Sequence, residues 1–262
     1  MRKLRFQYHM QLNFESPARE HHFTLRCMPV QDERQSIVKE QIAIYPKHYS
    51  STQVDSFGNR CMYGTTKEEH TCFAVDVKGE AVVDHTRFIE APSHKVGLYR
   101  YQTRLTEPGP YLNTFHECMS VMLEQMNSPL KKAQLMMEFL YYSYRYTPGV
   151  TGVNTTAEEA CRLQAGVCQD YAHMMLSLCR KEKIPCRYVA GMMLGEGATH
   201  AWIEVYADGR WIPLDPTHNR AVDDTYIKIS AGRDAQDCTI NQGVFMGGGK
   251  QQQEINVIVE EI

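Results

Sequence analysis

Residues 165–173 read AGVCQDYAH and place a cysteine at the point where a loop turns into a helix. After Cys168, apolar side chains recur at helical spacing, which predicts a helix from about Cys168 to Lys183. The first turn of a helix carries unpaired N–H groups and the positive end of the helix dipole, and both favour a thiolate over a thiol. Because a thiolate is the form that attacks a carbonyl carbon, Cys168 is a candidate nucleophile.

Two further motifs follow in order: residues 199–205 read THAWIEV and residues 211–218 read WIPLDPTH. His200 stands at the start of a predicted strand and Asp215 at the end of the next, with Asp-Gly at 208–209 as a hairpin signal. Cross-strand neighbours lie about 5 Å apart, so this hairpin can place the imidazole beside the carboxylate. A nucleophile needs a base, and the base needs an orienting partner, so the three residues are compatible with a Cys–His–Asp triad. Taken singly, they could instead be a buried thiol, a surface histidine and an aspartate that caps a turn.

The three ordered motifs resemble the core of the transglutaminase-like superfamily. Residues 146–151 (YTPGVT) and 184–191 (IPCRYVAG) are similar to its bacterial branch, whose members are described as cysteine proteases. Residues 22–26 (HFTLR) and 55–59 (DSFGN) are similar to the β domain that precedes this core in bacteria. The resemblance implies a papain-like fold with Cys168 as nucleophile, His200 as base and Asp215 as the group that orients the base.

The first hundred residues predict β structure. Residues 4–14 alternate apolar and polar side chains, as in a strand with one buried face. Turn residues separate further short segments, which predicts an antiparallel, sandwich-like arrangement. The sequence Glu-Pro-Gly-Pro at 107–110 interrupts regular structure, so we expect an N-terminal β domain over 1–108 and a catalytic core over 109–262. The further short segments that we expect to be strands of the N-terminal domain are 21–30, 36–46, 60–64, 69–77 and 81–90.

The second part predicts helices followed by an antiparallel sheet, and therefore an α+β class. Before the helix that starts at Cys168, helices are expected over 112–126 and 129–146, and Thr156 with Glu159 fits a capping box. Strands are expected over 186–194, 200–206, 210–215, 224–231 and 255–262.

Further residues are candidates to stabilise the oxyanion or to line the substrate site. Eukaryotic transglutaminases carry a tryptophan upstream of the cysteine that helps to form the oxyanion hole, but both tryptophans of this chain follow Cys168. The backbone N–H of Cys168 can supply one oxyanion donor, and Gln164 and Tyr146 are candidates for the second. Trp202 and Gln169 are candidates to line the substrate site, with sheet packing as the alternative for Trp202.

Composition excludes several classes of function. The chain has 262 residues, a net charge of −3 and no clustered basic excess, so we expect no nucleic-acid partner. No apolar run is long enough for a signal peptide or a membrane span, so we expect a cytoplasmic protein. Nine irregularly spaced cysteines without a CxxC pair argue against a disulfide framework and against structural zinc. We expect no cofactor and no metal.

The sequence therefore predicts a hydrolase that cleaves peptide or other amide bonds through a thioester. Transfer of the acyl group to an amine uses the same residues and stays open, as does a non-catalytic peptide-binding module on the same core. A metal site that adds His218 to the three triad residues is a further alternative. We expect a peptide or protein substrate, and the sequence leaves the oligomeric state open.

Overall fold

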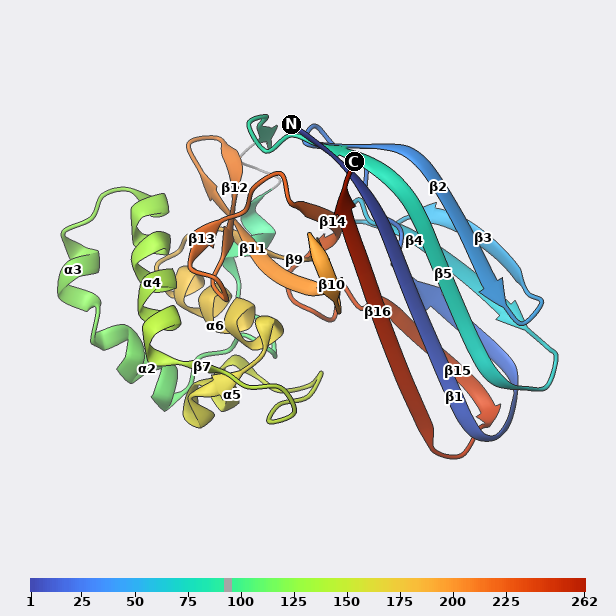
Figure 1. Cartoon of the computed structure of the whole chain (residues 1–262). Helices are drawn as coiled ribbons and strands as arrows, with labels where there is room; N and C mark the ends of the chain where they lie inside the picture. The colour runs from blue at the N-terminus through green and yellow to red at the C-terminus, as the bar shows by residue number, and fades with distance from the viewer. Residues whose placement is uncertain (92–95) are drawn as a thin grey trace.

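The computed structural model describes residues 1–91 and 96–262 and contains two antiparallel sheets with helices beside one of them (Figure 1). The helices pack on the six-stranded sheet, and the eight-stranded sheet forms the other half of the molecule (Figure 1). The expected α+β class with a papain-like core is confirmed. Within the described residues, no helix combines the length and the apolar character that a membrane crossing requires.

The eight-stranded sheet is organised around one very long strand, β1 (Arg2–Leu25). Its first half pairs with β5 and β16, and after an irregularity between Asn13 and Ala18 its second half pairs with β4 and β15. One strand thus belongs to both layers of the sandwich. The predicted interruption at 15–20 and the separate segments 69–77 and 81–90 are wrong, because each pair of segments forms one continuous strand. The other strands are β2 (Gln35–Tyr45), β3 (Tyr49–Val54), β4 (Arg60–Thr66), β5 (His70–Val83), β10 (Gly195–Gly197), β15 (Asn241–Gly247) and β16 (Gln251–Glu261).

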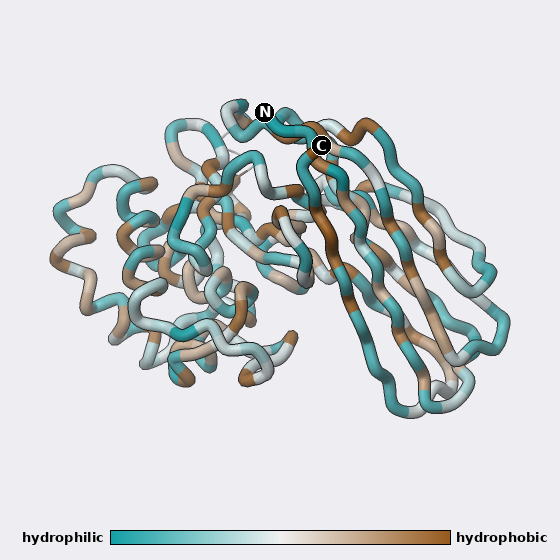
Figure 2. The backbone as a smooth tube through the Cα atoms, in the orientation of Figure 1, coloured by the Kyte–Doolittle hydropathy of each residue, from teal (hydrophilic) through white to brown (hydrophobic). Residues whose placement is uncertain are grey.

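Strict alternation along β1 produces the core of the sandwich. Phe6, Tyr8 and Met10 are fully buried, whereas the residues between them face outward, and hydrophobic and hydrophilic positions alternate along the tube in Figure 2. Burial of the Phe6 and Met10 side chains stabilises the fold by about 1.5–3 kcal/mol each. The two layers meet at aromatic rings, with the centroids of Phe23 and Phe73 4.9 Å apart.

The six-stranded sheet carries the segments with the chemical motifs. Its order is β13-β12-β11-β9-β14, and β6 pairs with β12. β11 pairs with β9 on one side and with β12 on the other. The pairing of β11 with β12 is the expected hairpin. The strands are β6 (Ile89–Glu90), β9 (Cys186–Met193), β11 (His200–Ala207), β12 (Arg210–Asp215), β13 (Arg220–Ala221) and β14 (Tyr226–Gly232).

The helices agree with the prediction except at the first. Residues 112–126 form two short helices instead of one, whereas the capping box at Thr156 and Glu159 is present. α6 is buried on nearly every side, so it is the central helix of the core. The helical elements are η1 (Gly97–Arg100), α2 (Pro110–Glu117), α3 (Ser120–Glu124), α4 (Pro129–Ser143), α5 (Ala157–Leu163) and α6 (Cys168–Lys181), and a two-stranded parallel pair joins β7 (Arg145–Tyr146) to β8 (Ala165–Gly166).

The last two strands lie in the first sheet and not in the core. β15 and β16 both pair with β1, although the sequence analysis assigned 109–262 to the core. The physical reason is burial, because Val257 and Val259 of β16 join the apolar core that the inward side chains of β1 form. The boundary expected near residue 108 stays a prediction, but residues 241–261 pack with the N-terminal sandwich.

A buried ion cluster joins the two halves. Glu204 of β11 is 1% exposed and contacts the charged groups of Arg187, Lys228 and Arg34 at 2.5, 3.3 and 3.6 Å. Burial alone would raise the pKa of Glu204, but the three cations outweigh it and hold the pKa well below its ordinary value. Arg34 comes from the sandwich half and also donates to the carbonyl of Trp211, so the cluster fixes one half on the other.

Replacing this carboxylate tests the cluster. We expect Glu204→Gln to lower the free energy of unfolding by about 3–5 kcal/mol, because it removes the carboxylate that Arg34 and Arg187 pair with and leaves Lys228 with Asp32 alone. The control is Glu196→Gln on exposed β10, which should change stability by less than about 0.5 kcal/mol. Denaturant unfolding measures both, and similar losses in the two variants would contradict the structural role of Glu204.

Candidate active site

Cys168 is the first residue of α6, and the turn before it is built by local contacts. Asp170 reaches back and accepts hydrogen bonds from the backbone N–H of Val167 at 2.7 Å and from the hydroxyl of Thr151 at 2.7 Å. A Cβ on Gly166 would overlap the Asp170 side chain, so this position requires glycine. The sequence Gly-Val-Cys-Gln-Asp therefore specifies the tight turn that presents the thiol at the helix start.

His200 and Asp215 lie side by side at the end of the β11–β12 hairpin. The Nε2 atom of His200 donates to the Oδ2 atom of Asp215 over 2.8 Å. Asp215 is completely buried, and the side chain of His200 is 10% exposed. The hairpin expected at 208–209 produces this pairing, because it aligns β11 and β12 antiparallel.

Asp215 is the centre of a larger hydrogen-bond network. Besides His200, its Oδ2 atom accepts from Nδ1 of His218 and from the hydroxyl of Tyr226, each at 2.8 Å. Its Oδ1 atom accepts from the backbone N–H groups of Thr217 at 2.9 Å and His218 at 3.3 Å. With every side of the carboxylate engaged, Asp215 has little freedom to move away from His200.

The charges of this pair stabilise each other. Burial would raise the pKa of Asp215, but hydrogen bonds from His200 and His218 hold it well below its ordinary range. Burial would lower the pKa of His200, but the Asp215 carboxylate and the adjacent Cys168 side chain outweigh it and raise the pKa to about 9. At neutral pH the geometry therefore favours an imidazolium between a carboxylate and a thiol.

Two cavities meet at His200. One, of about 670 Å³, is lined by Cys168, Gln169 and His200 together with residues of β15 and β16. The other contains Tyr146, His200 and His218 together with the β10 segment. The site is thus open on both sides of the imidazole, and both halves of the molecule contribute to its walls.

The candidate oxyanion donors and substrate-lining residues differ in whether they reach one of the two cavities. Gln169 lines the Cys168 cavity and Tyr146 the second one, whereas Gln164 is exposed and lines neither. Trp202 is 1% exposed and packs against Tyr226 with ring centroids 5.4 Å apart, in agreement with the sheet packing considered for it, and it lines neither of the two cavities. Its indole fills the space left by glycine at position 191 of the paired strand, where a Cβ would overlap it.

Sequence reasoning missed two partners of Asp215. His218 was considered only as a metal ligand, although its spacing of three residues was a usable signal for a local hydrogen bond. Tyr226 gave no such signal, because its hydroxyl reaches Asp215 only when β14 folds against the sheet. Arg220 donates to the same hydroxyl at 2.8 Å, which fixes the direction of the Tyr226 O–H.

One grouping of side chains could hold a metal ion. The ligand atoms of His200, Asp215 and His218 lie within 4.8 Å of one another, and two imidazoles with a carboxylate suit zinc. Hydrogen bonds of 2.8 Å from each imidazole to Asp215 already account for this proximity.

Comparison with known proteins agrees with this geometry. Residues 4–82 match the family model of the bacterial transglutaminase-like N-terminal region, and residues 120–216 match that of the transglutaminase-like superfamily. The chain belongs to the transglutaminase-like superfamily. Membership of this superfamily supports a cysteine-based enzyme in general.

Relatives of this superfamily member include an uncharacterized protein of Mycobacterium leprae, 27% identical over 94% of both chains. An uncharacterized protein of Mycobacterium tuberculosis is 33% identical over 40% of this chain and 39% of its own length. A solved structure, described as a putative cysteine protease of Cytophaga hutchinsonii, has a TM-score of 0.81 and 21% identity. It covers 100% of this chain and 91% of its own, which establishes the shared fold.

Removing the Asp215 charge tests the electrostatics. We expect the pKa of His200 to fall in Asp215→Asn from about 9 toward 6.5, because the largest favourable contact of the imidazolium is lost. The raised pKa means that protonated His200 stabilises the fold fully below pH 6.5, and that this contribution is lost as the pH rises through about 9. NMR titration of the His200 ring measures the shift, and equal pKa values in both proteins would contradict the coupling.

Proposed function

We propose that the protein is a cysteine peptidase or amidase with Cys168 as nucleophile, His200 as general acid and base, and Asp215 as the group that orients His200. One observation carries the proposal: His200 lines the same cavity as Cys168, and its far nitrogen bonds a fully buried carboxylate. With Nε2 on Asp215, the ring nitrogen left for the thiol and for substrate is Nδ1. This arrangement satisfies the requirement of a nucleophile for a base that is itself oriented.

The reaction proceeds in two halves. The Cys168 thiolate attacks the carbonyl carbon of an amide, and an S–C bond forms while the carbonyl electrons move to oxygen. The C–N bond then breaks, the His200 imidazolium gives its proton to the leaving amine, and a thioester remains. Water, deprotonated by neutral His200, attacks the thioester carbon, the S–C bond breaks, and a carboxylic acid leaves while the Cys168 thiolate and the His200 imidazolium are regenerated.

The oxyanion needs donors along this path. Cys168 is the first residue of α6, so its backbone N–H has no partner within the helix and is available at the helix start. Tyr146, which lines the cavity on the other side of His200, is the candidate we retain for the second donor.

Alkylation kinetics test the Cys–His pair directly. We expect iodoacetamide to label Cys168 at least about ten times faster than Cys118, although Cys118 is the exposed thiol of the two. His200→Ala should remove this difference, since the imidazolium then no longer favours the thiolate. Mass spectrometry of each modified peptide gives the rates, and a Cys168 no faster than Cys118 would sink the proposal.

Isotope incorporation distinguishes hydrolysis from acyl transfer. We expect peptide mixtures treated with the protein in H₂¹⁸O to yield new carboxylates with one ¹⁸O atom, and a labelled primary amine to stay unincorporated. His200→Ala should slow product formation by about 10²–10⁴-fold, and the control Cys118→Ala should retain it. Incorporation of the labelled amine into the peptides, without ¹⁸O in new carboxylates, would contradict hydrolysis and favour acyl transfer.

A further inference from the structure

β16 has one edge that is paired along its whole length and one that is mostly open. It pairs with β1 over residues 251–261, but with β10 only over residues 257–259. From 251 to 256, no described strand pairs with the edge of β16 that faces away from β1. We call residues 251–256 on this side the open edge.

The hydrogen bonds at the two ends of the β1–β16 ladder show which main-chain groups face the open edge. Ile262 donates to the carbonyl of Lys3 over 3.0 Å, and Glu15 donates to the carbonyl of Lys250 over 2.9 Å. The register is constant between these ends, and hydrogen-bonded pairs alternate in an antiparallel ladder. Even-numbered residues of β16 therefore bond to β1, and odd-numbered residues direct their N–H and C=O groups away from it.

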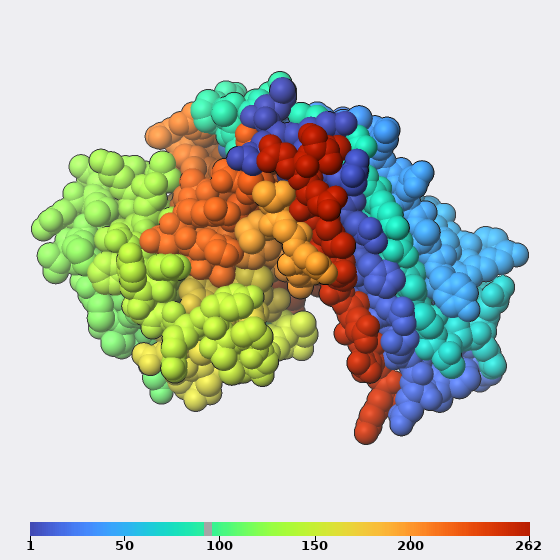
Figure 3. All heavy atoms as spheres, viewed as in Figure 1, coloured from blue at the N-terminus to red at the C-terminus, as the bar shows by residue number. Residues whose placement is uncertain are grey.

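Two of the three odd-numbered residues of the open edge lie at the nucleophile. Gln253 and Ile255 both line the cavity that contains Cys168 and His200. β10 occupies the same side of β16 just beyond them, and the chain runs from β10 to His200 in three residues. Figure 3 shows the surface hollowed beside the lower part of β16. A strand laid along the open edge would thus continue the line of β10 and pass the Cys–His pair.

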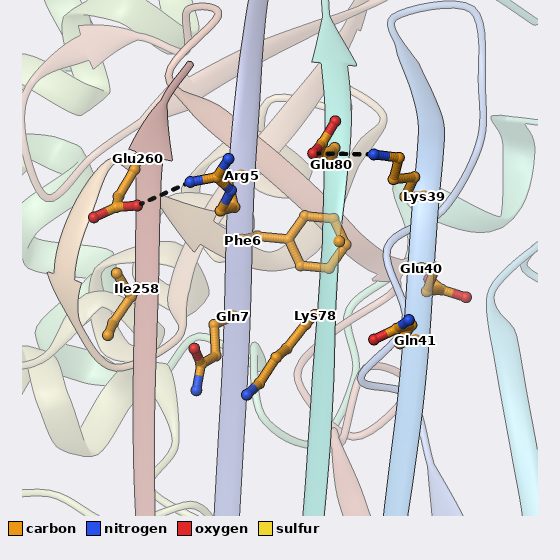
Figure 4. A pocket seen from close by; sticks show the side chains of 11 residues that line it. Arg5, Phe6, Gln7, Lys39, Glu40, Gln41, Lys78, Glu80, Ile258 and Glu260 are labelled. Carbon is orange, nitrogen blue, oxygen red and sulfur yellow. Dashed lines mark ion pairs between the residues drawn. The ribbon is translucent and has the colours of Figure 1, made fainter.

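The cavity is lined by apolar and uncharged polar side chains, apart from His200, whose charge is paired with Asp215. Among its described lining residues there is no Asp, Glu, Lys or Arg, and the polar groups are mostly side-chain amides. A hollow on the outer face of the sandwich has a charged lining instead. Side chains of both signs line it and form ion pairs there (Figure 4). Amides offer donors and acceptors together, as a polypeptide backbone does. The amide residues are Asn154, Gln169, Gln236, Asn241, Gln242 and Gln253.

We propose that the substrate is an uncharged, extended segment of polypeptide that pairs as an added strand with the open edge of β16 at Gln253 and Ile255. Strand addition draws affinity from main-chain hydrogen bonds and selectivity from alternate side chains. A charged side chain would lose water in this cavity without gaining a counter-charge, so the segment is neutral. The inference rests on the proposed function, because it assigns the substrate of the same nucleophile.

The test uses an irreversible peptide probe. An N-acetylated tetrapeptide of Ala, Ser and Val with a C-terminal fluoromethyl ketone alkylates the Cys168 sulfur with loss of fluoride. Versions with a single N-methyl group remove one main-chain donor each. We expect N-methylation at alternate amides to slow labelling by about tenfold, and N-methylation at the intervening amides to change it by less than about twofold, because alternate N–H groups face the strand. Lys or Glu in place of Ser should also slow labelling.

A matched pair of variants tests the protein side. Gln253→Pro removes an N–H group at the open edge and leaves the β1 ladder intact, as edge strands allow. We expect the ratio of the peptide-probe rate to the iodoacetamide rate to fall about tenfold. The control is Gln251→Pro, whose N–H faces the same way but which does not line the cavity, and its ratio should stay within about twofold of wild type.

The outcomes separate the two proposals. If iodoacetamide labels Cys168 no faster than Cys118, the proposed function fails. If Cys168 is reactive but N-methylation has no alternating effect, strand addition at β16 is overturned. Equal ratios in the two proline variants overturn it as well. Thermal unfolding shows whether Gln253→Pro is folded, and if it is not, the N-methyl series alone decides.

Discussion

The position of β16 between β1 and β10 is the constraint on which the rest of the molecule depends. Its ladder with β1 closes the sandwich, and its short ladder with β10 fixes the segment that leads to His200. The apolar residues Val257 and Val259 are buried between the two halves, so the same strand that orders the sandwich also anchors it to the core. The shape of the cavity at Cys168 follows from these two pairings, because β15 and β16 form one of its walls.

Within that frame, a single carboxylate organises the chemistry. Asp215 is buried, yet it stays ionised because protein donors replace the water that it loses. Hydrogen bonds from the side chains of His200, His218 and Tyr226 offset the cost of desolvating the charge, and His200 and Tyr226 are held in place by the strands β11 and β14. The same negative charge keeps His200 protonated at neutral pH, so the electrostatics of the site originate at a residue that substrate does not reach.

The sequence predicted the features that depend on local signals. The helix pattern after Cys168 and the Asp-Gly turn at 208–209 each act over a few residues, and each was found where expected. The placement of β16 depends on which edge is vacant, which period-2 alternation cannot reveal. Sheet packing and substrate lining were both open for Trp202, because its burial depends on a glycine in a neighbouring strand. Tyr226 acquires its role only through the packing of β14.

The separation of β1 from β16 along the chain has a consequence for biosynthesis. When the first 240 residues have left the ribosome, Cys168, His200 and Asp215 are already present, but the edge of β1 that β16 covers is still bare. An unpaired strand edge invites association with other chains, and contacts so distant in sequence form slowly. The wall beside Cys168 is therefore completed after the residues that it faces, so a nascent chain holds the proposed catalytic groups before it holds the surface proposed to select a substrate.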